Sequence, residues 1–331
     1  MGGCFFLNPP PPPPRGGAPP PPRGGGAPPR PRRGLGTRNT LNFWLFTGPF
    51  LIGLVIFVFV PIGWSIWLSF FDARFTVTPS HFVGFDNYTH MLSNSDFTGS
   101  LLTFTVFAAF IVPTTWALSL GLALLVHRLR FLRAFFRSVF FLPTACSYVA
   151  AALIWKMSIF NGVRFGLANT VVGWFGVENI AWVSNPSPPW YWLVIVTVRL
   201  WLQSGFYMIL FLAALQNIPG ELYEAAAIDG AKPGWQTFRH ITLPQLRATS
   251  TAVILLLLIA AYQAFDEFYN IVSTRATWGQ TPLMVLYKTA LGASQDYGSG
   301  SAGAVILTVL ICAVTLLQGR FMGFGRGEES R

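Results

Sequence analysis

The feature that most constrains this 331-residue chain is the distribution of its few charges. Only 10% of its residues are Asp, Glu, Lys or Arg, whereas an ordinary globular domain has roughly 25%. The charges separate long apolar runs, each able to cross about 30 Å of hydrocarbon. The sequence therefore predicts an all-α integral membrane protein and excludes soluble enzymes and secreted modules. The runs are Asn39–Phe71, Phe97–Val126, Ser138–Trp155, Trp190–Leu215 (interrupted by Arg199), Ala248–Phe265 and Tyr297–Gly319.

These runs predict a transmembrane domain over residues 41–325, between two cytoplasmic tails. Residues 1–40 hold 13 of the 25 prolines, six arginines and no acid, which is typical of a disordered, polyproline-like tail. No apolar signal region precedes the first run, and either a proline-rich docking segment or a dispensable extension fits this tail. Residues 326–331 form the second tail. Six transmembrane helices are expected at about 43–70, 100–126, 138–157, 190–215, 249–272 and 299–319.

The positions of Lys and Arg predict the orientation in the membrane. Sixteen of the 22 fall in the termini and in the connections on their side, four fall on the opposite side, and Lys156 and Arg199 lie at or within the runs. Such an excess marks the cytoplasmic side, so we expect both termini to be cytoplasmic. The net charge of +10 thus reflects topology and gives no indication of nucleic-acid binding.

Several kinds of chemistry lack their usual residues. No lysine lies in a phosphate-binding glycine loop. The three cysteines, Cys4, Cys146 and Cys312, are far apart, and no His and Cys cluster has metal-ligand spacing. Acidic residues within the expected transmembrane helices are limited to Asp266 and Glu267, at the outer part of the fifth, 249–272. We therefore predict no catalytic residue, no metal site and no cofactor on this chain.

A short helix is expected in the cytoplasmic connection between the fourth and fifth runs. This connection, residues 216–247, reads QNIPGELYEAAAIDGAKPGWQTFRHITLPQLR. Pro219 is typical of a helix start and Gly230 of a helix end, while Glu221 and Glu224 put negative charge at the positive end of the helix dipole. A helix of about nine residues is marginal alone in water. Its apolar residues therefore predict that it lies in a groove.

This connection resembles the signature of the inner-membrane permease subunits of binding-protein-dependent ABC importers. The signature reads E-A-A, three residues, G, about nine residues, then I-x-L-P. Ten residues separate Gly230 from Ile241 here, one more than the usual spacing. The matching residues are Glu224-Ala225-Ala226, Gly230 and Ile241-Thr242-Leu243-Pro244.

Further stretches in the expected order extend the resemblance over residues 40–325, toward the carbohydrate type (maltose or glycerol-phosphate permease-like). They are FVGFDNY (82–88), the FFLPTACSYVAAALIWKMSIF stretch with NG after it (140–162), the W-x-x-x-G-F-Y-M stretch from Trp201 to Met208, LQNIPGELYEAAAIDGA (215–231) and AFDEFYNIVST (264–274).

The resemblance implies a subunit that couples to an ATPase. In this family the loop helix is the coupling helix, which docks in a cleft of the ATPase subunit. ATP with Mg²⁺ then binds to the partner and not to this chain. The implied partners are a second homologous permease, an ATP-binding-cassette ATPase dimer, an extracytoplasmic solute-binding protein, a sugar or sugar derivative and membrane lipid. The implied location is a bacterial inner membrane. The implied coupling residues are Glu221, Glu224, Ala225, Ala226, Asp229, Gly230, Ile241, Leu243 and Pro244.

Candidates for the substrate pathway lie in the fourth and fifth expected helices, 190–215 and 249–272. Arg199 and Gln203 share one helical face, and the helical rise places Glu267 at a depth similar to that of Arg199. An ion pair of Arg199 with Glu267 or with Asp266 would offset the cost of burying either charge. The resemblance adds Phe206 and Tyr262 as faces on which a sugar could stack. Arg199, Gln203, Phe206, Tyr262, Asp266 and Glu267 are thus the candidates, and a purely structural ion pair is the alternative.

Three other functions stay open at this point. A permease of the same superfamily could serve a solute other than a sugar. An ion-coupled secondary transporter fits less well, because no acidic pair lies in mid-span. A membrane transferase acting on lipid-linked substrates would need Asp or His clustered in a cytoplasmic loop, and this sequence has no such cluster.

Overall fold

The computed structural model describes residues 37–129, 131–232, 234–272 and 278–322. The chain divides into two units, Met1–Val58 and Phe59–Arg331. Helix α1 (Thr37–Leu54) and most of the π-helical turn η1 (Val55–Phe59) belong to the first unit, and α2 (Val60–Leu68) opens the second. Helix α1 begins within the predicted tail of residues 1–40. The rest of that tail and residues 326–331 lie outside the described residues.

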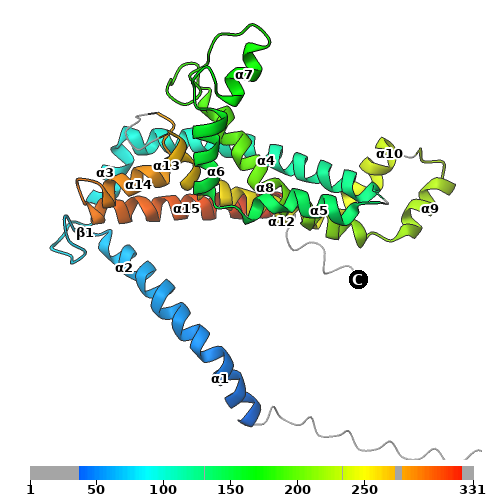
Figure 1. The fold of residues 1–331 in the computed structure, drawn as a ribbon. Coiled ribbons are helices and arrows are strands. Elements are labelled where there is room, and N and C mark those ends of the chain that lie inside the picture. Colours follow the sequence, from blue (N-terminus) through cyan, green and yellow to red (C-terminus); the bar gives the residue numbers. More distant parts are fainter. Residues whose placement is uncertain (1–36, 130, 233, 273–277, 323–331) are drawn as a thin grey trace, which may run out of the picture. The chain divides into compact units, whose positions relative to one another are not determined.

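Four helices, α4 (Ser95–Arg128), α8 (Tyr191–Gln216), α12 (Arg247–Tyr262) and α15 (Tyr297–Met322), form the body of the second unit (Figure 1). Helix α4 packs against α8 and α12, and α12 also packs against α15. The side chain of Asn94 caps α4 by accepting hydrogen bonds from the backbone N–H groups of Asp96 and Phe97. Asp96 in the first turn and Arg128 in the last complement the helix dipole.

By length and composition, the described part of the chain has four helices able to cross a membrane, or up to six if each of two bent pairs counts as one span. The single helices are Asn42–Leu68, Ser95–Arg128, Tyr191–Gln216 and Tyr297–Arg320. Arg133–Ala145 and Tyr148–Ile159 form one pair, bent by 94°, and Trp235–Gln245 and Arg247–Tyr262 form the other, bent by 70°. The protein is thus helical and rich in apolar spans, but two of the expected helices are not straight.

The predicted span 138–157 consists of several short pieces. They are α5 (Arg133–Phe141), the 3₁₀ turn η2 (Leu142–Ala145), α6 (Tyr148–Ile154) and the π-helical turn η3 (Trp155–Ile159). Pro143 lies in the 3₁₀ turn just before the bend. A proline has no N–H to donate and its ring crowds the preceding turn, which favours a break here.

The predicted span 249–272 is also divided. Helix α12 ends at Tyr262, and after the non-helical residues 263–265 the chain forms the short helix α13 (Asp266–Val272). Before α12, the bent pair contains α10 (Trp235–Thr237), the π-helical turn η4 (Phe238–Thr242) and α11 (Leu243–Gln245). The bend therefore follows the Ile-x-Leu-Pro part of the signature directly.

Small elements close the two ends of the four-helix body. At one end lie α3 (Asp86–Ser93), α14 (Pro282–Leu291) and a sheet of two antiparallel two-residue strands, β1 (Phe71–Asp72) and β2 (His81–Phe82). Asn87 ties this end together, because its side-chain amide donates 2.9 Å hydrogen bonds to the carbonyls of Ser69 and Phe71. Helix α9 (Gly220–Ile228) lies at the opposite end, beside α10 (Figure 1).

The long connection between η3 and α8 carries α7 (Leu167–Gly173) and projects from the body (Figure 1). It folds around the buried amide of Asn169, which donates to the carbonyls of Val163 and Ile180. The amide oxygen accepts from the Ile180 N–H and from the Trp182 indole. One side chain thus satisfies the polar groups of a connection that has little regular structure.

An aromatic cluster forms the core between α4, α8 and α13. Phe107 stacks on Trp192 with ring centroids 5.2 Å apart, and both rings contact Phe268, at 5.4 and 5.9 Å. Phe104 and Phe268 are fully buried and lie 5.1 Å apart. Such ring pairs add to the burial of apolar area. The cluster therefore fixes α13 against the two long helices.

Close packing explains why the Trp-x-x-x-Gly-Phe stretch has a glycine at position 205. A Cβ atom on this residue of α8 would overlap the carbonyl oxygen of Phe140, at the end of α5. Backbone atoms cannot yield as a flexible side chain can, so only glycine allows α8 to approach α5 this closely.

We therefore expect Gly205→Ala to lower the free energy of unfolding by about 1–3 kcal/mol, because it overpacks this contact. Thermal unfolding of the purified protein in detergent measures the effect. Gly121→Ala in α4 is the control, since no atom lies within 4 Å of its added Cβ, and alanine favours a helix interior by about 0.5–1 kcal/mol. Equal stability of the two variants would contradict this packing account.

Candidate functional site

The first part of the candidate site is α9, the helix predicted in the cytoplasmic connection. Pro219 is the residue before its first turn and has extended backbone angles, and Glu221 is the acidic residue of that turn. After the last helical residue, Gly230 has a φ of +81°, a conformation that glycine adopts without strain. The sequence thus determines both ends of this helix locally.

Helix α9 is largely uncovered by the rest of the chain. None of its residues is buried, and the side chain of Ile228 is 87% exposed. Glu224 and Ala225 are exposed and Ala226 is half-buried, while Asp229 and Gly230, just beyond the helix, are also exposed. A helix of this length with apolar residues in solvent has the properties of a docking element.

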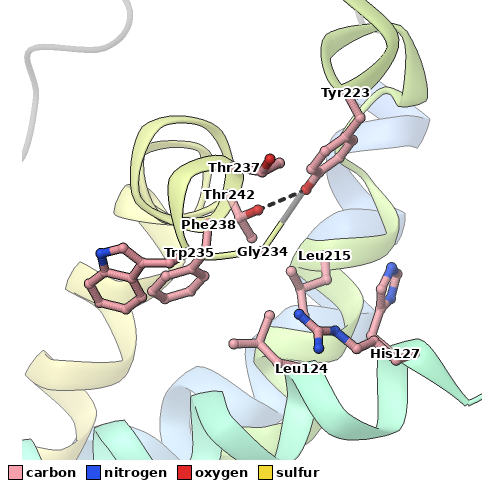
Figure 2. Close-up of a pocket in the computed structure, with 10 residues that line it drawn as sticks. Leu124, His127, Leu215, Tyr223, Gly234, Trp235, Thr237, Phe238 and Thr242 are labelled. Carbon is pink, nitrogen blue, oxygen red and sulfur yellow. Dashed lines mark hydrogen bonds between the residues drawn. The ribbon is translucent and has the colours of Figure 1, made fainter. Parts of the chain in front are cut away.

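The second half of the signature contacts α9 through one hydrogen bond. Ile241 and Leu243 are half-buried and Pro244 is exposed, in η4 and α11. The hydroxyl groups of Tyr223, on α9, and of Thr242, on η4, are hydrogen-bonded at 3.1 Å. Figure 2 shows this bond spanning the two segments. The two parts of the signature, distant in sequence, are therefore directly joined.

A cavity of about 580 Å³ lies between these segments and the ends of α4 and α8. Half of its lining residues are aromatic or basic, and Figure 2 shows Trp235 and Phe238 on one side and Leu124 and His127 on the other. Helix α9 is therefore not packed solidly on the body, and its hydrogen bond to η4 is a specific connection. The lining residues are Leu124, His127, Arg128, Leu215, Tyr223, Gly234, Trp235, Thr237, Phe238 and Thr242.

The second part of the candidate site is a buried ion pair between α8 and α13. The guanidinium of Arg199 donates one hydrogen bond to the carboxylate of Glu267 and another to the backbone carbonyl of Ala260. Both charged residues are only 2% exposed. The Arg199 guanidinium carbon also lies 5.9 Å from the centre of the Phe107 ring. Of the two partners that the sequence left open for Arg199, the structure pairs it with Glu267.

The other predicted pathway residues differ in accessibility. Gln203 is buried, and its side-chain amide donates a 2.9 Å hydrogen bond to the Tyr148 hydroxyl. Tyr262 is 1% exposed and donates to Thr105. Phe206, 41% exposed, and Asp266 are open to the surroundings. Asp266 and Glu267 thus lie side by side in sequence but in opposite environments.

Two polar residues of this region were missed by the sequence reasoning. Tyr148 is the partner of Gln203, and Lys156 donates a 2.8 Å hydrogen bond from Nζ to the carbonyl of Asn270 on α13. Lys156 had a usable signal, because a lysine at the end of an apolar run needs a partner. Within the described residues, no three His, Cys, Asp or Glu side chains are grouped so that they could hold a metal ion.

Comparison with known proteins shows the family to which this chain belongs. Residues 92–322 match the family model described as binding-protein-dependent transport system inner membrane component. The chain belongs to this family. It is thus a multi-pass integral membrane protein and a transport component, which confirms the resemblance and the prediction that it is not an enzyme.

Individual relatives cover most of this permease. It is 31% identical over 284 residues to the probable starch degradation products transport system permease protein AmyD of Thermoanaerobacterium thermosulfurigenes, with 85% of this chain and 94% of that protein aligned. It is 33% identical over 323 residues to the diacetylchitobiose uptake system permease protein NgcF of Streptomyces coelicolor, with 91% and 89% aligned.

A solved structure has the same fold. It is a chain of a bacterial alginate ABC transporter in complex with an alginate pentasaccharide-bound periplasmic protein, with a TM-score of 0.72 and 20% identity. The match covers 86% of this permease and 96% of that chain.

We expect Tyr223→Phe to loosen α9, because it removes the hydroxyl that joins the helix to η4. Hydrogen–deuterium exchange of the purified permease should show faster amide exchange in residues 220–228. The matched control is Tyr88→Phe, which removes the 2.7 Å hydroxyl–hydroxyl bond to Ser69 at the opposite end of the fold. Wild-type exchange of α9 in the Tyr223 variant would contradict this role.

Proposed function

We propose that this permease is one half of the translocation pathway of an ATP-driven, binding-protein-dependent importer of sugars or sugar derivatives. The observation that carries the proposal is the uncovered helix α9 with the E-A-A and Gly signature, in a chain of the binding-protein-dependent transport family. ATP hydrolysis would take place on a partner ATPase dimer, and this chain would bind no ATP or Mg²⁺ itself.

The coupling would run through α9 into α12. An ATPase that closes on nucleotide must move the membrane helices through a docked, rigid element. Helix α9 exposes apolar residues for such docking, and the bond between Tyr223 and Thr242 joins it to η4. The turn η4 continues through α11 into α12. A movement of α9 would therefore displace α12. The coupling residues would be Glu221, Glu224, Ala225, Ala226, Asp229, Gly230, Ile241, Leu243 and Pro244.

The membrane arrangement that we infer has six spans with both termini in the cytoplasm. Four spans are single helices, and each bent pair would count as one further span. The excess of Lys and Arg around the termini, α9 and the end of α4 supports this orientation. The solute-binding protein would then dock on the projecting connection that carries α7, and α9 would face the ATPase.

The proposal that the solute is a sugar is based on what the similar proteins are named for transporting. Two of them are named for the transport of starch degradation products and of diacetylchitobiose, and the solved relative transports alginate. We propose that Phe206 and Asp266, which are accessible, contact the passing sugar, with Gln203 near them. Arg199, Glu267 and Tyr262 are buried and would support the pathway from behind. A second permease subunit would supply the opposite wall.

The docking proposal predicts that Ile228→Asp removes the ATPase from the purified complex. A carboxylate on the exposed apolar residue of α9 would have to be desolvated in the groove, which costs more than the roughly 1–3 kcal/mol of a neutral polar group and lowers binding at least about tenfold. Phe165→Asp is the control, since Phe165 is similarly exposed, at 89%, in the α7 connection. Co-purification of tagged permease with the ATPase measures both. If the Ile228 variant retained an undiminished amount of co-purified ATPase, that result would count against docking through α9.

The pathway proposal predicts that Phe206→Ala lowers the maximal rate of sugar uptake. Loss of one stacking contact is worth about 1 kcal/mol, roughly fivefold in rate. The sugar concentration at half-maximal uptake should stay constant, since the binding protein determines it. Asp266→Asn tests the carboxylate in the same way, and Asp86→Asn, an exposed carboxyl on α3, is its control. Wild-type rates for both pathway variants would remove these residues from the pathway.

A further inference from the structure

Helix α13 is too short to be stable by itself, and its position depends on what holds it. Its seven residues, Asp266–Val272, follow the break at residues 263–265, and an isolated helix of this length does not persist in water. It packs against α6 and α8 (Figure 1). These two helices belong to other apolar runs, so α13 is packed on spans to which it is not continuous in sequence.

A cation from α8 occupies the break before α13. The last carbonyls of α12 lack helical partners, and Arg199 donates to one of them, that of Ala260. The same guanidinium pairs with Glu267 in the first turn of α13. Arg199 therefore contacts the end of one helix and the start of the next. Its two contacts differ in strength, because a buried ion pair is much harder to break than a hydrogen bond to a carbonyl.

A second cation holds the other end of α13. Lys156, in η3, donates to the carbonyl of Asn270, two residues before the helix ends. A cation at this end complements the helix dipole. Between the two ends, Phe268 packs into the aromatic cluster with Phe107 and Trp192. Both ends and the middle of α13 are thus attached to α4, α8 and η3.

We propose that Arg199 and Lys156 are positioning residues that make α13 one rigid body with α8 and η3, and that the break at residues 263–265 is a hinge on which α12 moves during transport. This inference rests on the proposed function, since α12 continues directly from the segment joined to α9. When α12 tilts, the hydrogen bond from Arg199 to the Ala260 carbonyl breaks. The ion pair between Arg199 and Glu267 persists. The hinge converts a movement at α9 into a change of angle between α12 and α13.

Distances between spin labels test the hinge in the assembled transporter, with permease, partner permease, ATPase and binding protein in lipid. Cys4, Cys146 and Cys312 are first replaced by Ser, and label pairs then join α12 to α13 (Leu256 and Tyr269) and α8 to α13 (Leu193 and Tyr269). Between the nucleotide-free and the vanadate-trapped state, we expect the first distance to change by several Å and the second to stay constant. A constant first distance, or a second distance that changes as much, would overturn the proposal.

The positioning role is tested by sugar transported per ATP hydrolysed. We expect Lys156→Gln to lower this ratio at least threefold while ATP hydrolysis continues, because α13 no longer stays with η3. Arg199→Lys, which keeps the charge but loses the second donor group of the fork, should act in the same way and broaden the distance between α8 and α13. Lys156→Arg should restore the wild-type ratio. Lys288→Gln, which removes a half-buried lysine on α14, is the matched control.

The outcomes separate the hinge from the proposed function. Wild-type uptake that does not depend on ATP would overturn both, since the hinge needs an ATP-driven movement. ATP-dependent uptake with a wild-type ratio in Lys156→Gln and Arg199→Lys would overturn the positioning role and leave the importer function intact. An equal loss in Lys288→Gln would also overturn it, because the effect would then not depend on α13.

Discussion

The ion pair of Arg199 with Glu267 is the interaction on which the arrangement of the helices depends. In a chain with so few charges, an unpaired buried charge cannot be compensated by neighbours, and removing one partner of such a pair typically costs about 3–5 kcal/mol. The two residues are on α8 and α13, so these helices must keep one register. The aromatic cluster of Phe104, Phe107, Trp192 and Phe268 lies on the same contact and keeps it apolar.

Breaks in the helices are possible because the freed backbone groups find partners inside the protein. In hydrocarbon an unpaired carbonyl or N–H is costly, and non-helical backbone is tolerated only where protein or a cavity surrounds it. At the break between α12 and α13, Arg199 satisfies the Ala260 carbonyl. Near the bend between α5 and α6, the Thr144 hydroxyl donates to the Leu202 carbonyl of α8, and Gly205 lets the two backbones approach. Helix α8 therefore supports both broken segments.

The sequence predicted much of this arrangement, and its failures have physical causes. Charge-poor runs predict where apolar helices lie, since the cost of burying charge depends on composition. They do not predict the direction that the chain takes after a proline such as Pro143, so the 94° and 70° angles of the bends could not be predicted, and no proline or glycine marks the break at residues 263–265. From the sequence, Asp266 and Glu267 were equivalent partners for Arg199, because both are acidic and neighbours in sequence lie at nearly the same depth. They point about 100° apart on a helix, and only packing selects Glu267. The ends of α9 were predictable because Pro219 and Gly230 act locally.

The structure also explains why force from the ATPase would enter the membrane through α12. A cavity lies between α9 and the ends of α4 and α8, so α9 is linked to α8 by the short connection 217–219 rather than by solid packing. Its hydrogen-bonded connection leads to η4, from which α11 and α12 follow along the chain. At the far end of α12, the next helix is held by Arg199 and Lys156 from other spans. Helix α12 therefore has the segment joined to α9 at one end and a break at the other, and in the hinge that we propose a movement of α9 appears as a tilt of α12 against the body that α8 and α13 form.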